Sequence, residues 1–396
     1  MLSLASFVVA AAIWLPSAHL FFAPPHDAYR TADGRPGPRT QQLVDWHLHL
    51  WADPMLRRAE IDRMRRSNAE WDFMGRTFLV MALANLAERE PQRRDELLGV
   101  ADAIIDETLA LEAEYGHLYF LMPYARDAAF LADPPRSVFV DGEIAMMLAC
   151  RQLIADNPAY RQPLRDRVAI VVEAMSAGPI GSAESYPDEG WLFCNALAAA
   201  AVRVSDAVTG DDHAEFLGDW LAATREHLTD PATGLLVSRF TYDGRTIEGP
   251  EGTCLWLAAH CLQLIDPVFA EQQYHLTRDA LARDFLGFGY AREWPTGTAG
   301  HADVDSGPIV PVLEASAGSS GLAVLGAAAF DDERYLRQLL TALEAVAFPI
   351  ESRDGLRFAA SNQVGDAVML YALVQGPLWQ KTLDRVGPAI DDGDQP

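Results

Sequence analysis

A chain of 396 residues, half of them apolar, is long enough to bury a large single core. Its 56 acidic side chains against 31 basic ones give a formal net charge of −25, which excludes nucleic acid as a partner, because phosphate binding needs clustered Lys and Arg. The cysteines have the spacing of neither a disulfide framework nor a zinc site, so we expect no structural metal; they are Cys150, Cys194, Cys254 and Cys261.

The N-terminal segment, residues 1–24, contains no Asp, Glu, Lys or Arg and is mostly apolar. A helix over Leu4 to Ala23 comes close to the roughly 20 residues that a bilayer span needs. We predict a transmembrane anchor or an uncleaved signal, since the segment lacks the Lys or Arg that normally opens a cleaved signal peptide. Its orientation stays open: the positive-inside rule favours a cytoplasmic domain, whereas export would place the domain in the periplasm or cell envelope. The positive charges to which this rule applies follow the segment at Arg30, Arg35 and Arg39.

Residues 25–40 are rich in Pro, Gly and polar side chains and are predicted to form a linker. From 41 to 385, apolar residues recur at intervals of three and four, as in Leu97-Ala101-Ile104-Ile105-Leu109, which indicates helices. No change of composition marks a second soluble domain. We therefore expect a single all-α domain over 41–385, followed by a disordered acidic tail at 386–396.

Six short motifs of small and acidic residues each precede or open a strongly apolar stretch. Successive motifs lie roughly 45 to 70 residues apart, which fits one long helical hairpin for each motif. The motifs are Trp71-Asp72-Phe73, Asp141-Gly142-Glu143, Pro187-Asp188-Glu189-Gly190, Pro250-Glu251-Gly252, Asp303-Val304-Asp305-Ser306-Gly307 and Gly365-Asp366.

The segments between the motifs contain amphipathic helices, predicted over Asp95–Tyr115, Tyr160–Ser176 and Asp211–Leu228. A helix that is apolar on all sides belongs inside a protein, and one with a polar face belongs outside. Six inner helices alternating with six outer ones close into an (α/α)₆ barrel. The inner N-termini then share one end of the barrel and gather the six motifs into one mouth.

The acidic residues of the motifs have a structural explanation as well as a catalytic one. A single Asp at a helix start caps free N–H groups and stabilises the helix by about 0.5 to 2 kcal/mol, which accounts for Asp72 or Asp141. One cap is enough for one helix, so doubled carboxylates are the stronger site candidates. These are Asp188 with Glu189, and Asp303 with Asp305.

Two carboxylates in a partly apolar cleft have their pKa values pushed apart, so that one donates a proton while the other accepts one. Such a pair serves glycoside hydrolysis, dehydration or isomerisation equally well. Aromatic residues near the motifs either stack on a sugar or isoprenoid chain or fill the core. They are Trp71, Trp191, Phe193, Trp256 and Trp294.

Cys194 stands in the first turn of a predicted helix, where its pKa can be lowered, so it is a candidate acid/base thiol. The histidines lack an acidic partner at helical spacing and are expected in the core or at the surface rather than as metal ligands; those considered are His47, His49 and His260. Neither a Gly-rich phosphate loop nor a nucleophile elbow is present.

The stretch Pro187-Asp188-Glu189-Gly190-Trp191-Leu192-Phe193-Cys194-Asn195 resembles the active-site segment of the bacterial linalool dehydratase-isomerase family. That segment has Pro-Asp, then aromatics, then Cys-Asn at the same spacing. The similarity extends from about Trp71 to Leu383 and is most convincing from Pro187 to Phe269. Further counterparts lie at Thr229–Gly234, Asp266–Glu271, Asp303–Gly307 and Leu356–Phe358.

This resemblance implies an α/α barrel, no cofactor, and reversible loss of water from a tertiary allylic alcohol with isomerisation. Cys194 carries over as an acid/base thiol. The chain departs from the family at three places: Ser185 replaces a second cysteine, Glu143 replaces a histidine, and Glu251-Gly252 replaces an aromatic hydroxyl before Trp256. Glu143 can take over as a proton carrier if its pKa is raised, and the departures predict a more acidic, more hydrophilic pocket.

The leading hypothesis is a lyase or isomerase that dehydrates or isomerises a small-molecule alcohol. The expected proton-transferring residues are Cys194, Glu143, Asp188 and Glu189. The expected substrate-binding residues are Trp71, Asp72, Ser185, Trp191, Phe193, Glu251, Trp256, Asp303 and Asp305.

The alternatives are a carbohydrate-processing enzyme with paired carboxylates and a non-catalytic binding barrel. The expected partners are the substrate and, through residues 1–24, a membrane; a homo-oligomer is compatible with the sequence.

Overall fold

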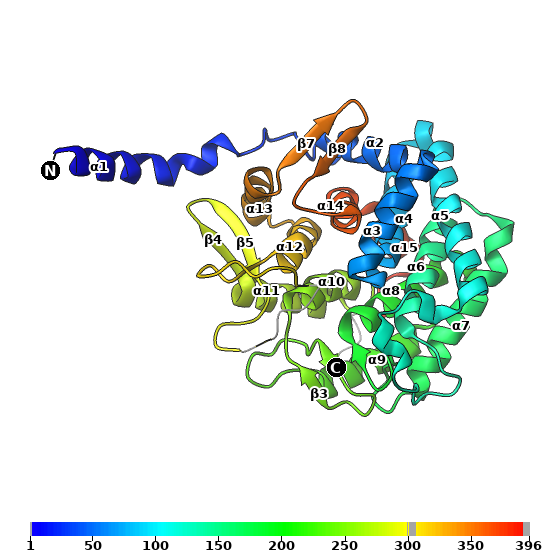
Figure 1. Ribbon diagram of the computed structural model, residues 1–396. Coiled ribbons are helices and arrows are strands. Elements are labelled where there is room, and N and C mark those ends of the chain that lie inside the picture. The colour runs from blue at the N-terminus through cyan, green and yellow to red at the C-terminus, as the bar shows by residue number, and fades with distance from the viewer. Residues whose placement is uncertain (1, 299, 301–305, 391–396) are drawn as a thin grey trace.

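The computed structural model describes residues 2–298, 300 and 306–390, and six inner helices form a closed ring (Figure 1). Each inner helix packs on the next one along the chain, and the last packs on the first. The predicted (α/α)₆ barrel is therefore confirmed. The inner helices are α4 (Ala69–Arg89), α6 (Val138–Ile154), α8 (Leu192–Thr209), α10 (Gly252–Leu262), α12 (Ala317–Ala329) and α14 (Gln363–Val374).

One outer helix precedes each inner helix in the chain. The outer helices are α3 (Pro54–Ser67), α5 (Arg94–Tyr115), α7 (Arg161–Ala177), α9 (Ala214–His227), α11 (Pro267–Leu281) and α13 (Glu333–Val346). Two further helices complete the barrel: α2 (Pro38–Ala52) packs on α14, and α15 (Pro377–Val386) packs on α4, α6 and α8. Short 3₁₀ turns lie at Ala18–Phe21, Pro91–Arg93, His117–Tyr119, Pro123–Arg126 and Pro158–Tyr160.

Helix α15 covers the end of the barrel where the inner helices finish. Its backbone N–H at Leu378 donates to Asn85 near the end of α4, and Arg385 donates to the carbonyl of Ala207 near the end of α8. The indole of Trp379 donates to the carbonyl of His260 in the last turn of α10. The opposite end, where the inner helices begin, is left for the site.

The inner helices are buried on all sides because they are apolar on all sides. Every residue of α6 is buried, and the ring of inner helices forms one continuous apolar core. At the contact of α6 with α8, a Cβ on Gly142 would lie 2.7 Å from the Cβ of Ala198. Glycine in the predicted motif thus allows the two helices to approach closely.

Three small antiparallel sheets lie in the connections that lead into inner helices, and the sequence did not predict them. Their strands have two to five residues, too few for alternation of apolar and polar side chains to stand out. The first sheet contains β1 (Gly190–Trp191), β2 (Arg239–Phe240) and β3 (Thr246–Glu248). The second contains β4 (Ala282–Phe285), β5 (Phe288–Arg292) and β6 (Ala315–Ser316), and the third β7 (Pro349–Ser352) and β8 (Gly355–Phe358).

The N-terminal helix α1 (Leu2–Ser17) projects away from the barrel, as Figure 1 shows. The span Leu4–Phe21 has a mean hydropathy of 1.8, and none of it is buried. Helix α8 is also long and apolar enough to cross a membrane, but 89% of it is buried in the barrel. Among the described helices, α1 alone therefore combines such a span with full exposure.

Both segments that flank the predicted barrel domain pack against it where they are described. In the predicted linker, Tyr29 is buried and donates to Glu344 at the end of α13, and Arg39 forms an ion pair with the same carboxylate at 2.8 Å. In the predicted tail, the N–H of Ile390 donates to the carbonyl of Ile265 at 2.8 Å. Residues 391–396 lie outside the described residues.

Candidate functional site

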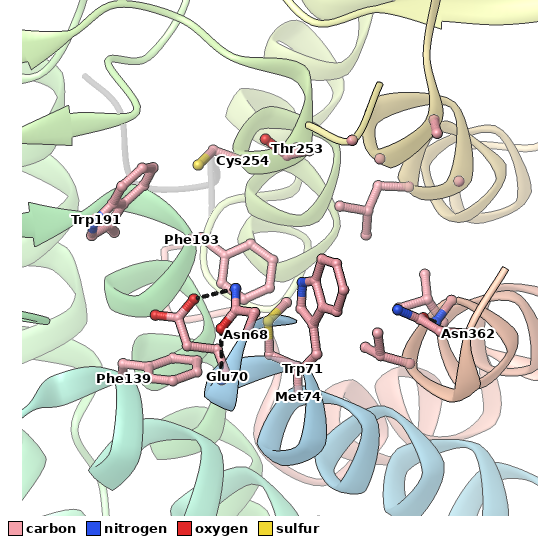
Figure 2. Close-up of a pocket in the computed structure, with 18 of the residues that line it drawn as sticks. Asn68, Glu70, Trp71, Met74, Phe139, Trp191, Phe193, Thr253, Cys254 and Asn362 are labelled. Atoms are coloured by element: carbon pink, nitrogen blue, oxygen red, sulfur yellow. Dashed lines mark hydrogen bonds between the residues drawn. The ribbon is translucent and has the colours of Figure 1, made fainter. Parts of the chain in front are cut away.

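A cavity of about 590 Å³ opens at the end of the barrel where the inner helices begin. All six inner helices, or the residues directly before them, contribute to its wall. The predicted gathering of inner N-termini around one mouth is thus observed. Figure 2 shows Glu70, Trp71 and Met74 of α4 on one side of the cavity, with Thr253 and Cys254 of α10 on another.

Most of the wall is apolar, in contrast to the hydrophilic pocket that the family departures predict. Aromatic rings come from Trp71, Phe139, Trp191 and Phe193, which brings three of the predicted stacking residues together. The other apolar side chains are Met74, Met122, Leu322, Val364 and Val368. A hydrocarbon chain therefore fits this wall better than a polyhydroxylated sugar does.

Glu70 is the carboxylate that lines this cavity among the described residues. It lies in the first turn of α4, whose N-cap Asn68 accepts from the backbone N–H of Glu70 at 2.8 Å. The carboxylate accepts from the side-chain amide of Asn68 at 3.2 Å and from the hydroxyl of Tyr186 (Figure 2 shows the first of these bonds). Tyr186 in turn accepts from the N–H of Met122 at 2.9 Å, which fixes its hydroxyl. The amide of Asn68 and the hydroxyl of Tyr186 are both uncharged donors.

Cys194 lines the cavity from the first turn of α8, as predicted, but its pKa is not lowered. Burial holds the pKa of this thiol well above its usual range, and the nearby carboxylates of Glu70, Glu143 and Glu189 raise it further; a hydrogen bond with Ser185 acts in the opposite direction. Desolvation of the thiolate outweighs the favourable helix terminus. At neutral pH the side chain is therefore a protonated thiol, which holds its proton more tightly than an exposed thiol does.

A second thiol, Cys254, lines the same cavity from α10. It is the third residue of α10, as Cys194 is the third residue of α8, so the two stand at equivalent positions on neighbouring inner helices. Burial, followed by the charge of Glu251, holds the pKa of Cys254 well above its usual range.

Glu143 lies behind the cavity wall, in the contact between α6 and α4. One of its oxygens accepts from the hydroxyl of Thr77 at 2.6 Å, and the other has no hydrogen-bond partner although it is buried. Burial raises the pKa of Glu143 to about 8, against the lowering effect of Thr77 and with a further rise from the charge of Glu70. The condition for a proton carrier, a raised pKa, is therefore present.

Asp188 and Glu189 form a tight turn before α8 and do not line the cavity. Asp188 has the left-handed φ of 53°, and its carboxylate accepts from the N–H of Tyr242 at 3.1 Å, which holds the turn on the neighbouring loop. Glu189 accepts from the indole of Trp191 at 2.6 Å and from the hydroxyl of Tyr124 at 3.1 Å. It thereby positions two aromatic side chains of the cavity wall.

The remaining predicted residues divide between the cavity's surroundings and the core. Ser185 is buried beside Cys194, and its hydroxyl accepts from the N–H of Trp191 at 3.3 Å. Asp72 is buried in an ion pair with Arg76, and Trp256 is buried with its indole donating to Ser319; neither lines the cavity.

Glu251 is likewise outside the wall and accepts from the indole of Trp294 at 3.2 Å. Asp303 and Asp305 lie outside the described residues. Of the predicted catalytic set, Cys194 reaches the cavity, and Glu143 lies close behind it.

The residues that the sequence analysis missed are Glu70, Tyr186, Tyr124 and Cys254. The Asn68-x-Glu70 pattern at a helix start is typical of ordinary capping, and Asn68 does cap α4. Tyr124 and Tyr186 stack with ring centroids 4.5 Å apart, although they come from two separate connections. Cys254 sits in an apolar run in which a thiol is expected as a small core residue.

No three metal-ligating side chains gather anywhere in the described part of the chain. His260 is buried and bonds the hydroxyl of Tyr371 at 2.7 Å and the amide of Gln263 at 3.0 Å, as a core histidine. Burial lowers the pKa of His260 to about 4, so it is neutral.

A family model described as linalool dehydratase/isomerase matches residues 154–364 of this chain, which is more than half of its length. The match extends from the end of α6 to the start of α14. It includes the segment from Pro187 to Asn195 that carries the resemblance.

Two solved structures are similar to this chain at low sequence identity. A GH76 α-mannanase from Bacteroides thetaiotaomicron has 12% identity and a TM-score of 0.46, with 80% of this chain and 88% of its own covered. A family 105 glycoside hydrolase from C. acetobutylicum has 13% identity and the same TM-score of 0.46, with 86% of this chain and 99% of its own covered. At these values neither likeness bears on the activity of this chain.

Proposed function

Because this chain belongs to the linalool dehydratase/isomerase family, we propose that it dehydrates or isomerises an alcohol with its own acid/base side chains. The observation that carries this proposal is the mainly apolar cavity lined by both a thiol, Cys194, and a carboxylate, Glu70. The expected substrate is an alcohol with a hydrocarbon chain, of which a terpenoid alcohol is one class.

Loss of water from an alcohol needs a proton for the departing hydroxyl and a base for the proton on the neighbouring carbon. The protonated thiol of Cys194 supplies the first proton as the C–O bond breaks. Glu70, which accepts hydrogen bonds from uncharged donors, takes the proton of the C–H bond as the double bond forms. Return of water to the other end of an allylic system gives the isomer.

The positive charge that develops on carbon needs stabilisation in an apolar site. The faces of aromatic rings attract cations, and the wall offers Trp71, Phe139, Trp191 and Phe193. Glu189 holds Trp191 and Tyr124 in place through hydrogen bonds and acts as a positioning residue.

Glu143 is assigned a supporting role. With its pKa near 8, it is mostly protonated at neutral pH, which spares Cys194 a neighbouring negative charge. When Glu143 ionises at higher pH, its charge opposes formation of the Cys194 thiolate. The acid strength of the thiol is thereby linked to the protonation of Glu143.

The two alternatives from the sequence fit the site less well. A glycoside hydrolase needs two carboxylates that flank the scissile bond, and the described part of the wall supplies Glu70 alone. A non-catalytic barrel predicts titrating groups with ordinary pKa values, whereas Cys194 and Glu143 are both strongly shifted next to a cavity. These features favour the dehydratase or isomerase.

We also propose that α1 anchors the protein in a membrane. Its apolar span contains no buried residue and has the composition of a bilayer helix. The barrel then works at the membrane surface, on the side that the orientation of α1 decides.

The test is turnover by the full chain, in detergent and under reducing conditions, of a panel of tertiary and allylic alcohols that includes linalool. Products are followed by gas chromatography–mass spectrometry. We expect conversion of at least one alcohol and about a 100-fold or larger loss in Cys194→Ala. The matched control is Cys261→Ala, a buried thiol on α10 that does not line the cavity and whose loss should leave turnover intact. Full activity of Cys194→Ala, or no turnover across the panel, contradicts the proposal.

A further inference from the structure

The base of α1 rests on an aromatic turn of the barrel. Phe288, the first residue of β5 directly after the β4–β5 turn, lies against His19 and Phe22, with ring centroids 6.4 Å and 6.1 Å apart. His19 also packs over Gly287, where a Cβ would lie 2.5 Å from the imidazole ring. The apolar helix therefore leaves the barrel at a defined place.

Exposed apolar side chains surround this exit point. Phe285, the last residue of β4, is 54% exposed, and Phe348, directly before β7, is 65% exposed. Val346, the last residue of α13, is 64% exposed. We call these three residues the apolar collar.

The N-terminal segment contacts the barrel next to the collar residues at two places. The first contact is at Phe288, three residues after Phe285. At the second, Tyr29 and Arg39 bind Glu344, two residues before Val346 and four before Phe348. Figure 1 shows α1 leaving on the side of the molecule that carries β4, β5, α13 and β7.

We propose that the apolar collar is a second membrane contact, which seats the barrel on the bilayer that α1 enters. This inference rests on the proposed anchoring by α1 and is independent of the reaction. Large apolar side chains at the water–lipid boundary gain by leaving water, and aromatic residues favour that depth. A collar at the foot of a spanning helix is held at this depth by the helix itself.

The charge of the chain specifies the kind of lipid surface. With a formal net charge of −25, the protein is repelled by anionic headgroups, so the contact has to be apolar rather than electrostatic. A zwitterionic phosphatidylcholine bilayer is therefore the expected and sufficient surface.

Seating the collar on the bilayer brings the cavity close to the membrane. The strand β8 that pairs with β7 leads within a few residues to Ser361 and Asn362, which line the cavity, and β6 leads to Ala317 and Gly318. An apolar alcohol dissolved in the membrane then has a short path to the site.

The experiment uses the full chain in nanodiscs of phosphatidylcholine, with or without nitroxide-labelled lipid. The four native cysteines are buried, so a single introduced surface cysteine can be labelled with an environment-sensitive fluorophore. The variants are Phe285→Cys and Phe348→Cys for the collar, Val9→Cys for α1, and Val268→Cys as an exposed control at the start of α11, the end of that helix remote from β4.

We expect nitroxide lipid to quench the label at positions 9, 285 and 348 to a comparable degree and to leave position 268 unquenched. Quenching at 9 without quenching at 285 and 348 overturns the collar contact but keeps the anchor. Absence of quenching at all positions overturns both. Collar labels that are shielded only at high protein concentration, in detergent as in nanodiscs, identify a second copy of the chain as the occupant and also overturn the proposal.

Discussion

Helices α4 and α6 each begin with two acidic residues separated by one position, and the two members of each pair have different surroundings. Asp72 and Asp141 meet guanidinium groups between the inner and outer rings. Glu70 and Glu143 have uncharged hydrogen-bond donors at or behind the cavity wall. The comparison separates carboxylates that hold the barrel together from carboxylates that can exchange protons.

The first group forms ion-pair networks that join neighbouring rings. Arg76 is buried and binds Asp72 at 2.9 Å and Glu107 of α5 at 2.8 Å. On α6, Asp141 binds both Arg136 and Arg167. Each network ties an inner helix to residues outside the inner ring.

Two largely buried carboxylates show how the partner affects the pKa: Glu112, on α5, which is paired with Arg136 and Arg167, and Glu143. Although burial raises the pKa of Glu112, its hydrogen bonds with Arg167 and Arg136 lower it on balance, so this carboxylate stays charged. At Glu143 burial dominates, and the pKa rises to about 8. A cationic partner fixes the charge of a buried carboxylate, whereas a neutral partner leaves it free to titrate near physiological pH.

The largest expected effect comes from Arg76→Leu, which tests whether Asp72 belongs to a structural ion pair. The change leaves Asp72 buried without its closest cation, and such a loss typically costs about 3 to 5 kcal/mol of unfolding free energy. Urea unfolding followed by circular dichroism measures it. The double variant Asp72→Asn/Arg76→Leu removes the buried charge as well and should recover part of the loss. A single variant as stable as the parent contradicts the assignment of Asp72 to a structural ion pair.

The next largest effect is on turnover and comes from Glu70→Gln. Glutamine keeps the shape of the side chain but cannot take up a proton as a carboxylate does, so we expect kcat/KM to fall about 100-fold, equivalent to about 2.7 kcal/mol. Stability should change by about 1 kcal/mol, because the glutamine amide oxygen still accepts from Asn68 and Tyr186.

Asp72→Asn is the matched control, two residues away on the same helix. It should lower stability and leave the kcat/KM of the folded protein close to that of the parent. Equal losses of turnover in Glu70→Gln and Asp72→Asn would remove the distinction between the two carboxylates.

The fold could be predicted from the sequence because all six inner helices share one feature, a stretch of helical length that is apolar on nearly all sides. Five of the six motifs lie at or next to the start of an inner helix, although the side chains that cap these helices, such as Asn68 on α4, lie outside the motifs. Gly142 shows the close contact that such a motif permits. Closure of the ring follows from the number of hairpins. The short strands could not be predicted, since two to five residues carry too little pattern.

The site was harder to predict, for a physical reason that α4 illustrates. An inner helix is apolar on all sides, so the sequence contains no polar face that fixes its rotation about its own axis. Whether Glu70 or Asp72 faces the cavity depends on that rotation. Tyr186 and Tyr124 depend on the paths of two connections, which only tertiary packing decides. Cys194 was predicted both from its place in the first turn of an apolar helix and from the family resemblance, and the structure places it in that turn at the cavity.

The smallest expected effect is on the pH dependence of the unfolding free energy, and it tests whether Glu143 titrates. The pKa of Glu143 is about 8 in the folded state, above the ordinary value of 4.5, so the folded state binds the proton more tightly. Its contribution to stability is therefore fully present below the unfolded pKa and is lost as pH rises through the folded pKa. Between these values the loss is about 1.4 kcal/mol per pH unit.

Glutamine at position 143 keeps the bond from Thr77 and carries no titrating group, so Glu143→Gln should remove this part of the pH dependence. Urea unfolding of the parent and of the variant at about pH 6 and pH 7 gives four free energies. We expect the parent to lose about 1.4 kcal/mol more than the variant does between these two conditions. Parallel pH profiles would mean that Glu143 is already ionised in the folded protein, which contradicts its assignment as a carboxylate that titrates near neutral pH.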